Sequence, residues 1–139
     1  MADKIQLEVV TPERPVVSEA VDIVIATSTE GEFGVLPHHA PLLTTLTAGE
    51  LRYRVGGQQE SLAVLGGFAQ VADNKVTILA DAAEKAREID LDRAARARER
   101  AEKRLAAARA EEVDFVRAEA ALKRALLRLK LAQKAAGSQ

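Results

Sequence analysis

The chain has 139 residues, of which 47% are hydrophobic, 29% are charged and 3% are aromatic. It contains no cysteine, which excludes disulfides and thiolate metal sites, and no apolar stretch approaches the roughly 18–20 residues that a membrane span needs. The first residues lack the cationic segment and apolar run of a secretory signal, so any membrane association is expected to come through a partner.

The chemical character of the chain changes near residue 85. Residues 1–84 hold five Lys/Arg and twelve Asp/Glu, a net charge of −7, whereas residues 85–139 hold fifteen and nine, a net charge of +6. Glycine, proline and β-branched residues are frequent before this point, and alanine and arginine dominate after it. The sequence therefore predicts two domains, 1–84 and 85–139, that present opposite potentials to different partners.

The first domain has the pattern of many short strands. Alternating or apolar runs predict strands at residues 5–10, 21–25, 51–55, 61–65, 68–71 and 76–80, with further short strands joined by a Gly/Pro loop within 31–45. Thr11-Pro12 and Arg14-Pro15 are predicted to stop the first strand, and Gly56-Gly57 and Asp73-Asn74 to form tight turns. This pattern favours an antiparallel β-sandwich or flattened barrel.

The second domain has helical periodicity. Asp90 is a predicted N-cap, and apolar residues recur at helical spacing over 91–108 and again over 115–129, with a predicted turn over 109–113. Two helices of roughly 20 residues, about 30 Å long, joined by a short connection, are expected to form an antiparallel hairpin. Because the seam is mostly alanine, we expect the hairpin to be marginal and able to separate.

No catalytic set is recognisable in the sequence. His38 and His39 are adjacent and point to different faces of an extended segment, and no third ligand stands at a suitable spacing, so no metal site is predicted. The serines lie in no nucleophile motif, and there is neither a P-loop nor a G-x-G-x-x-G sequence. We therefore predict that the protein is not an enzyme.

Arginines follow one face of each predicted helix. They are Arg93, Arg96, Arg100 and Arg104 in the first helix, and Arg117, Arg124 and Arg128 in the second. Folding the helices back about Glu111 places Arg93 opposite Arg128. The same fold places Arg100 near Arg124.

Two interpretations of these arginines remain open from the pattern alone. Guanidinium groups facing one another suit a polyphosphate between them, with Glu84 and Asp90 at the open end to accept bonds from a ribose or base. The alternative is a solvated face with i,i+4 ion pairs such as Glu99 with Lys103. A nucleic-acid interface is disfavoured, because acids are interleaved in the basic tail and the acidic first domain repels phosphate backbones.

Four stretches together carry a resemblance to a known family. They are LEVVTPE (7–13), GEFGVLPHHAPLLT (31–44), GGFAQVADNKVTILAD (66–81), and IDLDRA (89–94) followed by RAEAALKRALLRL (117–129). In this order and at this length, the chain resembles the epsilon subunit of a bacterial F-type ATP synthase.

The resemblance implies a non-catalytic rotor subunit at the cytoplasmic face of the bacterial inner membrane, held there only through the complex. It implies that the β-sandwich binds the gamma subunit and the rotor c-ring, with Glu32 at the ring and His39 near gamma. The chain departs from the family at His38, where Gly or Asn is more frequent, which makes the local backbone a point to examine.

The resemblance also implies that the helices regulate the complex. In the family they either fold down or extend along gamma towards the catalytic alpha and beta subunits, and the extended form inhibits ATP hydrolysis. Some bacterial members bind ATP in the folded hairpin through an I/L-D-x-x-R-A motif, which leaves any magnesium requirement open. The matching residues here are Ile89, Asp90, Arg93 and Ala94, with Glu84, Arg100, Arg124 and Arg128 at further matching positions. A free-standing ATP sensor without a synthase role is the remaining alternative.

Overall fold

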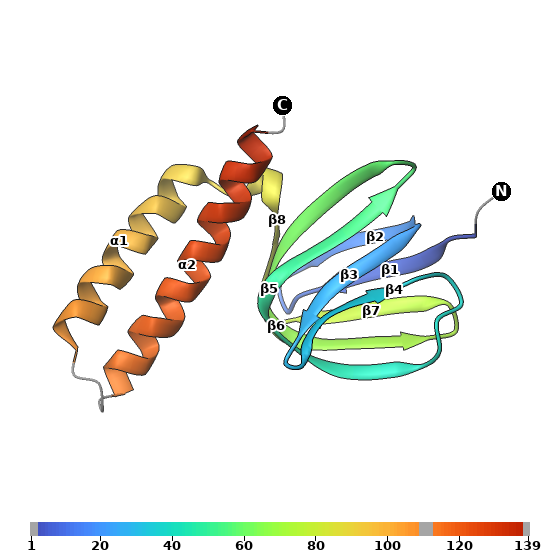
Figure 1. Ribbon diagram of the computed structural model, residues 1–139, viewed down its shortest axis with the longest axis horizontal. Helices are drawn as coiled ribbons and strands as arrows, with labels where there is room; N and C mark the ends of the chain where they lie inside the picture. The colour runs from blue at the N-terminus through green and yellow to red at the C-terminus, as the bar shows by residue number, and fades with distance from the viewer. Residues whose placement is uncertain (1–2, 109–112, 138–139) are drawn as a thin grey trace. The chain divides into compact units, whose positions relative to one another are not determined.

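The computed structural model describes residues 3–108 and 113–137. The chain divides into two compact units, of which the first ends at Lys85 and the second begins at Ala86. Figure 1 shows that strands build the first unit and two helices build the second. Each unit has its own packing and is described separately.

The first unit is an eight-stranded mixed sheet. Its strands are β1 (Ile5–Val10), β2 (Pro15–Val21), β3 (Ile23–Ser28), β4 (Gly31–Val35), β5 (Leu42–Val55), β6 (Gln58–Ala72), β7 (Lys75–Ala80) and β8 (Ala83–Lys85). The hydrogen-bonded order is β2-β1-β7-β6-β5-β3-β4, with β8 paired to β6, so the sheet is not closed into a barrel. The pairings are antiparallel as predicted, except that β1 and β7 run parallel.

The length of β5 and β6 gives the sheet two layers around one core. These strands have 14 and 15 residues and stay paired over most of their length. One part of β6 pairs with β8 and another part with β7, and the sheet curves over on itself in Figure 1. Strands β1–β7 contribute to a single buried cluster, which makes this unit a sandwich.

Strict alternation places the core where the sequence predicts it. Ile5, Leu7 and Val9 of β1 are completely buried, while the residues between them are partly exposed. In the parallel pairing with β7, Leu7 lies opposite Val76 and Val9 opposite Ile78. Complete burial of such a side chain contributes about 1.5–3 kcal/mol.

The strand predicted over residues 21–25 is wrong. Val21 ends β2 and Ile23 begins β3, so the segment belongs to two strands that meet at Asp22. Val24 is buried, whereas Ile23 and Ile25 are only half-buried, so the inward face is the opposite of the predicted one. The three consecutive apolar residues of 23–25 give no alternation, and periodicity could therefore not fix the register.

Two predicted turns are confirmed, and one predicted interruption is not. Asp73 and Asn74 have φ of 51° and 58°, and Gly56 and Gly57 have φ of 56° and 87°, the positive values that two-residue hairpins require. At Gly66-Gly67, in contrast, β6 continues without a break. A Cβ at Gly67 would lie 2.1 Å from the Leu79 carbonyl oxygen, so glycine serves there for close backbone approach.

The second unit is the predicted helical hairpin. A short 3-10 helix, η1 (Ala86–Glu88), precedes α1 (Leu91–Ala107) and α2 (Val113–Gly137), and α1 and α2 pack side by side (Figure 1). Asp90 is the N-cap of α1, as predicted: its Oδ1 accepts a hydrogen bond of 3.0 Å from the Arg93 backbone N–H. Of the turn predicted over 109–113, residues 109–112 lie outside the described residues, and Val113 begins α2.

Candidate functional site

Small side chains at heptad spacing bring the two helices together. Ala94 and Ala101 are the buried residues of α1, and Ala118, Ala125 and Ala132 are buried on α2. A spacing of seven residues corresponds to nearly two helical turns and keeps these alanines on one stripe of each helix. The predicted alanine seam is therefore present, and it lets the two backbones approach closely.

Two arginines from each helix line a cavity at this seam. The cavity has a volume of about 160 Å³, and its described lining consists of Arg100, Arg104, Arg124, Arg128 and four alanines. A larger cavity of about 710 Å³ lies further along the hairpin, and its described lining includes Arg104, Arg117, Arg124 and Asp114. Arg104 and Arg124 line both cavities, so the two spaces adjoin.

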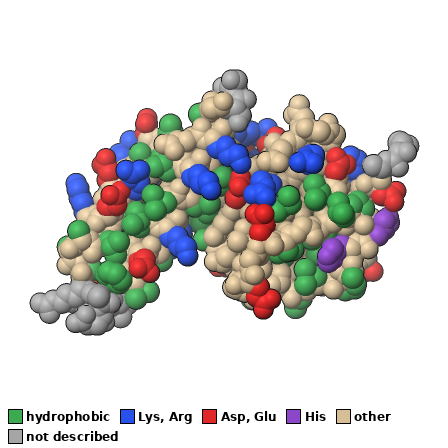
Figure 2. Space-filling model, in the orientation of Figure 1, with side chains coloured by type: hydrophobic (Ala, Val, Ile, Leu, Met, Phe, Trp, Pro, Cys, Tyr) green, Lys and Arg blue, Asp and Glu red, His purple; other side chains and the backbone are tan. Residues whose placement is uncertain are grey.

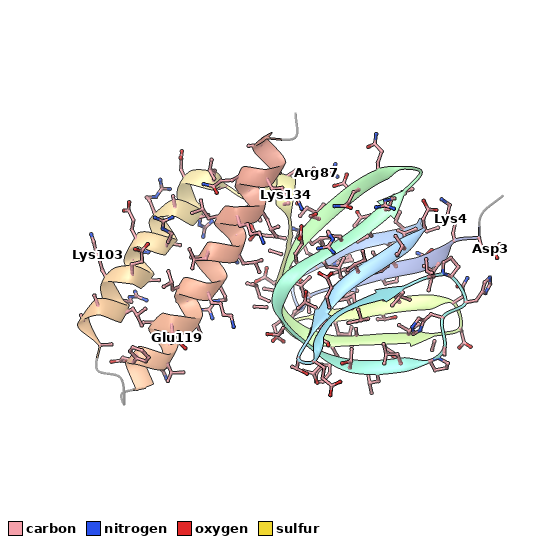
Figure 3. All side chains as sticks on the ribbon, viewed as in Figure 1. Asp3, Lys4, Arg87, Lys103, Glu119 and Lys134 are labelled. Carbon is pink, nitrogen blue, oxygen red and sulfur yellow. The ribbon has the colours of Figure 1, made fainter. Side chains whose placement is uncertain are left out.

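Charge of both signs covers the remainder of the helical unit. Figure 2 shows Lys and Arg side chains interspersed with carboxylates over the helices. On α1, Arg98 and Glu102 form an i,i+4 ion pair with a 2.8 Å contact between Nε and Oε1. Lys103 is exposed and projects outward from α1 in Figure 3. The solvated-face interpretation thus describes the outer side of α1, while the cavity lining is arginine and alanine.

Three of the predicted ATP-binding residues lie together at the smaller cavity. Arg100, Arg124 and Arg128 all contribute to its lining, and Arg93 does not. The fold-back count, which paired Arg128 with Arg93, is wrong in this detail. It ignored the tilt of helical side chains towards the N-terminus of their own helix, which in an antiparallel pair carries Arg128 towards the closed end and Arg93 away from it.

The I-D-x-x-R-A residues lie at the start of α1. Ile89 is half-buried and donates its backbone N–H to the Ala86 carbonyl at 3.3 Å. Asp90 caps the helix through Oδ1, and its backbone carbonyl accepts the first helical hydrogen bond, of 3.0 Å, from Ala94 N–H. Arg93 lies seven residues before Arg100, about 10 Å along the helix axis. The motif therefore has a structural role in starting α1, and it stands apart from the arginine-lined cavity.

Glu84 belongs to the sandwich unit. It is the central residue of β8, lies opposite Ala63 of β6 and is half-buried. Because the two units are separate, Glu84 stays a predicted ligand residue from the first unit.

The predicted subunit-interface residues lie on β4 and in the turn after it. Glu32 is exposed on β4 and accepts a hydrogen bond of 3.1 Å from Arg52, which also contacts Glu50 at 3.2 Å. The bond to Glu32 is the main cause that raises the pKa of Arg52, so this arginine stays charged. His39 is half-buried, with Nδ1 2.6 Å from the Ala40 carbonyl oxygen, a geometry that favours a proton on Nδ1.

An exposed apolar row on the outer face of the sandwich was missed by the sequence analysis. Leu43, Phe68 and Leu79 are 72%, 55% and 55% exposed. Phe68 lies directly opposite Leu79 in the β6–β7 pairing, and Leu43 lies diagonally across from Phe68 because it pairs with Gln70. The signal was the apolar residue on each face of these strands, which alternation cannot assign to solvent or core.

Two structural surveys concern metals and membranes. Among the described residues, no group of three or more histidine, aspartate or glutamate side chains is placed to hold a metal ion. In residues 3–108 and 113–137, no helix combines the length and apolar character that crossing a bilayer requires.

Known families match both units. Residues 4–86 match the ATP synthase Delta/Epsilon chain beta-sandwich domain, and residues 87–133 match the long alpha-helix domain of the same chain. The ATP synthase epsilon chain of Syntrophobacter fumaroxidans is 62% identical over 106 residues, 76% of this chain and 79% of that relative. The epsilon chain of Dehalococcoides mccartyi is 49% identical over 131 residues, 94% of each chain.

Solved structures share the fold. A chain in the cryo-EM structure of the Euglena gracilis mitochondrial ATP synthase (OSCP/F1/c-ring, rotational state 1) is 28% identical, with a TM-score of 0.75, and the match covers 96% of this chain and 81% of that one. A chain of the Tetrahymena thermophila mitochondrial ATP synthase central stalk and c-ring has a TM-score of 0.58 at 18% identity, over 96% of each chain. The predicted resemblance, and with it the prediction of a non-catalytic subunit, is confirmed by these matches. With both of its units matched in order, the chain belongs to the delta/epsilon chain family of ATP synthase.

Proposed function

We propose that the protein is a central-stalk subunit of a proton-translocating ATP synthase that helps couple proton flow to ATP synthesis and restrains ATP hydrolysis through its helices. The family membership supports the rotor role. The opposite net charges of the two domains support separate partners for each, with gamma and the c-ring at the sandwich and the catalytic alpha and beta subunits at the basic helices. Its location would be peripheral, at the cytoplasmic face of the bacterial inner membrane, through the complex alone.

The apolar row of Leu43, Phe68 and Leu79 supports a protein partner for the sandwich, and gamma is the partner that we propose. Apolar side chains in a contiguous exposed group mark protein interaction sites. Residues in the centre of such a surface dominate the binding energy, and aromatic residues are frequent among them. Phe68, with an apolar neighbour on one adjoining strand and another diagonally across the other, has that central place.

Capture of purified gamma by the full chain tests this assignment. Replacing Phe68 with threonine is expected to weaken gamma binding at least tenfold while leaving the fold intact, because the side chain is already 55% exposed and threonine suits a strand. Leu126→Gln, at a 45% exposed position on α2, is the matched control and is expected to bind gamma as the wild type does. Undiminished gamma binding by both Phe68→Thr and Leu79→Thr would exclude this surface.

A second part of the proposal assigns ATP binding to the folded hairpin. The observation that carries it is the convergence of Arg100, Arg124 and Arg128 on one cavity. Guanidinium forks match phosphate oxygens and form charge-assisted hydrogen bonds with them. Asp90 and Glu84 suit the other end of a nucleotide, since capping uses only one Asp90 oxygen and a carboxylate has two.

ATP bound in this way would act as a signal and would not be hydrolysed. A ligand that binds only the folded hairpin stabilises it by RT ln(1 + [L]/Kd), about 2.7 kcal/mol at a hundredfold excess over Kd. The alanine seam buries few large side chains, so a shift of this size would decide between the folded and extended helices. At low ATP the helices would extend and inhibit hydrolysis.

Calorimetric titration of the full chain with ATP tests the sensor. One ATP per chain is expected, with at least tenfold weaker binding in Arg100→Ala, because that variant loses a charge-assisted contact. Arg96→Ala is the matched control: it removes the same charge from the same helix outside the cavity lining. Absence of binding at millimolar ATP, or equal loss in both variants, would contradict a specific site, while the rotor role would still stand.

A further inference from the structure

The smaller cavity of the hairpin is surrounded by charge of one sign. Arg100 and Arg104 lie one turn apart on α1, and Arg124 and Arg128 lie one turn apart on α2, so two guanidinium groups approach from each helix. The other lining residues are alanines, which have no polar side-chain atoms. Like charges repel by about 1 kcal/mol per pair at 4 Å in bulk water. An anion in this space would replace the repulsion with attraction.

The size of the cavity indicates the class of anion. Its volume of about 160 Å³ equals roughly five water molecules at about 30 Å³ each. Pockets that enclose a drug-sized organic ligand usually measure about 300–1,000 Å³. The space therefore suits a short chain of phosphoryl groups, whose oxygens accept bidentate hydrogen bonds from arginine. A nucleoside attached to that chain would lie outside it.

We propose that this cavity binds a polyphosphate chain as such, and that Arg104 is one of its phosphate-binding residues. Arg104 is not among the residues that the family resemblance implied, but it lies one turn from Arg100 and lines the cavity with it. It also lines the adjoining larger cavity, so it stands where the two spaces meet. The inference deepens the proposed ATP site and rests on it, since ATP and inorganic tripolyphosphate share the chemistry that the arginines recognise.

Titration of the full chain with sodium tripolyphosphate, and separately with ATP, tests the inference. The wild type is expected to bind one tripolyphosphate. Arg104→Ala is expected to weaken both ligands at least tenfold, and alanine maintains the helix because its helix propensity is the highest. Arg104→Lys keeps the charge without the bidentate fork and is expected to fall between the two. Arg96→Ala, the matched control, is expected to change either affinity less than threefold.

The outcomes separate this inference from the ATP sensor. Tripolyphosphate binding that Arg104→Ala weakens, without any ATP binding, would support the polyphosphate site and contradict the sensor. ATP binding that is equal in the wild type and Arg104→Ala would support the sensor and overturn the role of Arg104. Failure of the wild type to bind tripolyphosphate would overturn the inference even if ATP binds.

Discussion

His38 adopts a backbone conformation that L residues with bulky side chains rarely take. Its φ is 66°, and its backbone N–H donates a 2.8 Å hydrogen bond to Asn74 Oδ1. Asn74 in turn donates from Nδ2 to the Lys4 carbonyl at 2.9 Å, which ties the loop to the start of β1. The left-handed region costs about 1–2 kcal/mol for most residues, and Asn tolerates it better. The Gly or Asn that the resemblance implies at this position thus has a conformational cause.

Replacing His38 with asparagine is expected to stabilise the protein by part of that cost, up to about 1 kcal/mol. The lost contact between His38 Nε2 and Asp3, both well exposed, offsets little of it. Thermal melts of the wild type, His38→Asn and the control His39→Asn check the expectation. His39 is outside the positive-φ residues, so its variant should show no gain, and a lower melting temperature for His38→Asn would contradict the argument.

Asp22 links the acid stability of the sandwich to one carboxylate. It pairs with Lys4, and its Oδ2 accepts a 2.9 Å hydrogen bond from the Gly56 N–H. The hydrogen bond from Lys4, followed by that from Gly56, lowers the pKa of Asp22 below its usual 3.8. Because folding lowers this pKa, the contribution to stability is fully present above 3.8 and is lost as the pH falls through the lower folded value.

Urea unfolding at pH values on both sides of 3.8 tests the linkage. The wild type is expected to lose more of its unfolding free energy on acidification than Asp22→Asn, whose amide can still accept from Gly56 but has no charge to titrate. Parallel pH profiles for the two proteins would show that Asp22 does not contribute.

At the scale of elements, Asp90 determines where α1 begins. Replacing it with alanine removes the acceptor for the Arg93 N–H and is expected to destabilise the helix by about 1 kcal/mol, whereas Asp90→Ser keeps a capping oxygen. Amide exchange over residues 91–94 is the measurement. If both variants bind ATP weakly but only Asp90→Ala frays, Asp90 contacts the ligand as well as capping the helix. Equal protection in all three proteins would remove the capping argument.

The alanine seam determines how closely α1 and α2 pack. Ala101 is 3% exposed, and Ala101→Leu is expected to overpack the seam, at a cost of about 1–3 kcal/mol. Ala106→Leu, at an exposed position of the same helix, is the control. Faster amide exchange across both helices in Ala101→Leu alone is the expected result. Equal exchange in the two variants would mean that the seam tolerates a larger side chain and is looser than described.

Sequence patterns predicted the elements whose signals are local. Alternation at Ile5, Leu7 and Val9 identified β1, and the cap at Asp90 identified the start of α1. Alternation could not separate β2 from β3, because 23–25 is apolar on both faces, nor reveal that β1 and β7 run parallel, because that pairing joins residues about 70 apart in the chain.

The candidate site was predictable in part for the same reason. Helical spacing identified the arginine faces, but side-chain tilt, which a fold-back count ignores, decides that Arg128 and not Arg93 lines the cavity with Arg100.

At the scale of the whole molecule, each unit has its own task in the account: the acidic sandwich holds the partner in the stalk, and the basic hairpin responds to ATP. The division follows from packing, since the sandwich core is made of large aliphatic side chains and the hairpin seam mainly of alanine. Elements with few large buried side chains lie at the low-stability end of a protein. The hairpin is therefore the part of the molecule that a ligand is best able to stabilise.

Hydrogen–deuterium exchange of the full chain with and without ATP tests this central claim most directly. The account predicts slower exchange across α1 and α2 at saturating ATP, an unchanged core in β1, β6 and β7, and no such protection in Arg100→Ala. Unchanged exchange in the helices at millimolar ATP, or protection confined to the sandwich, would contradict it.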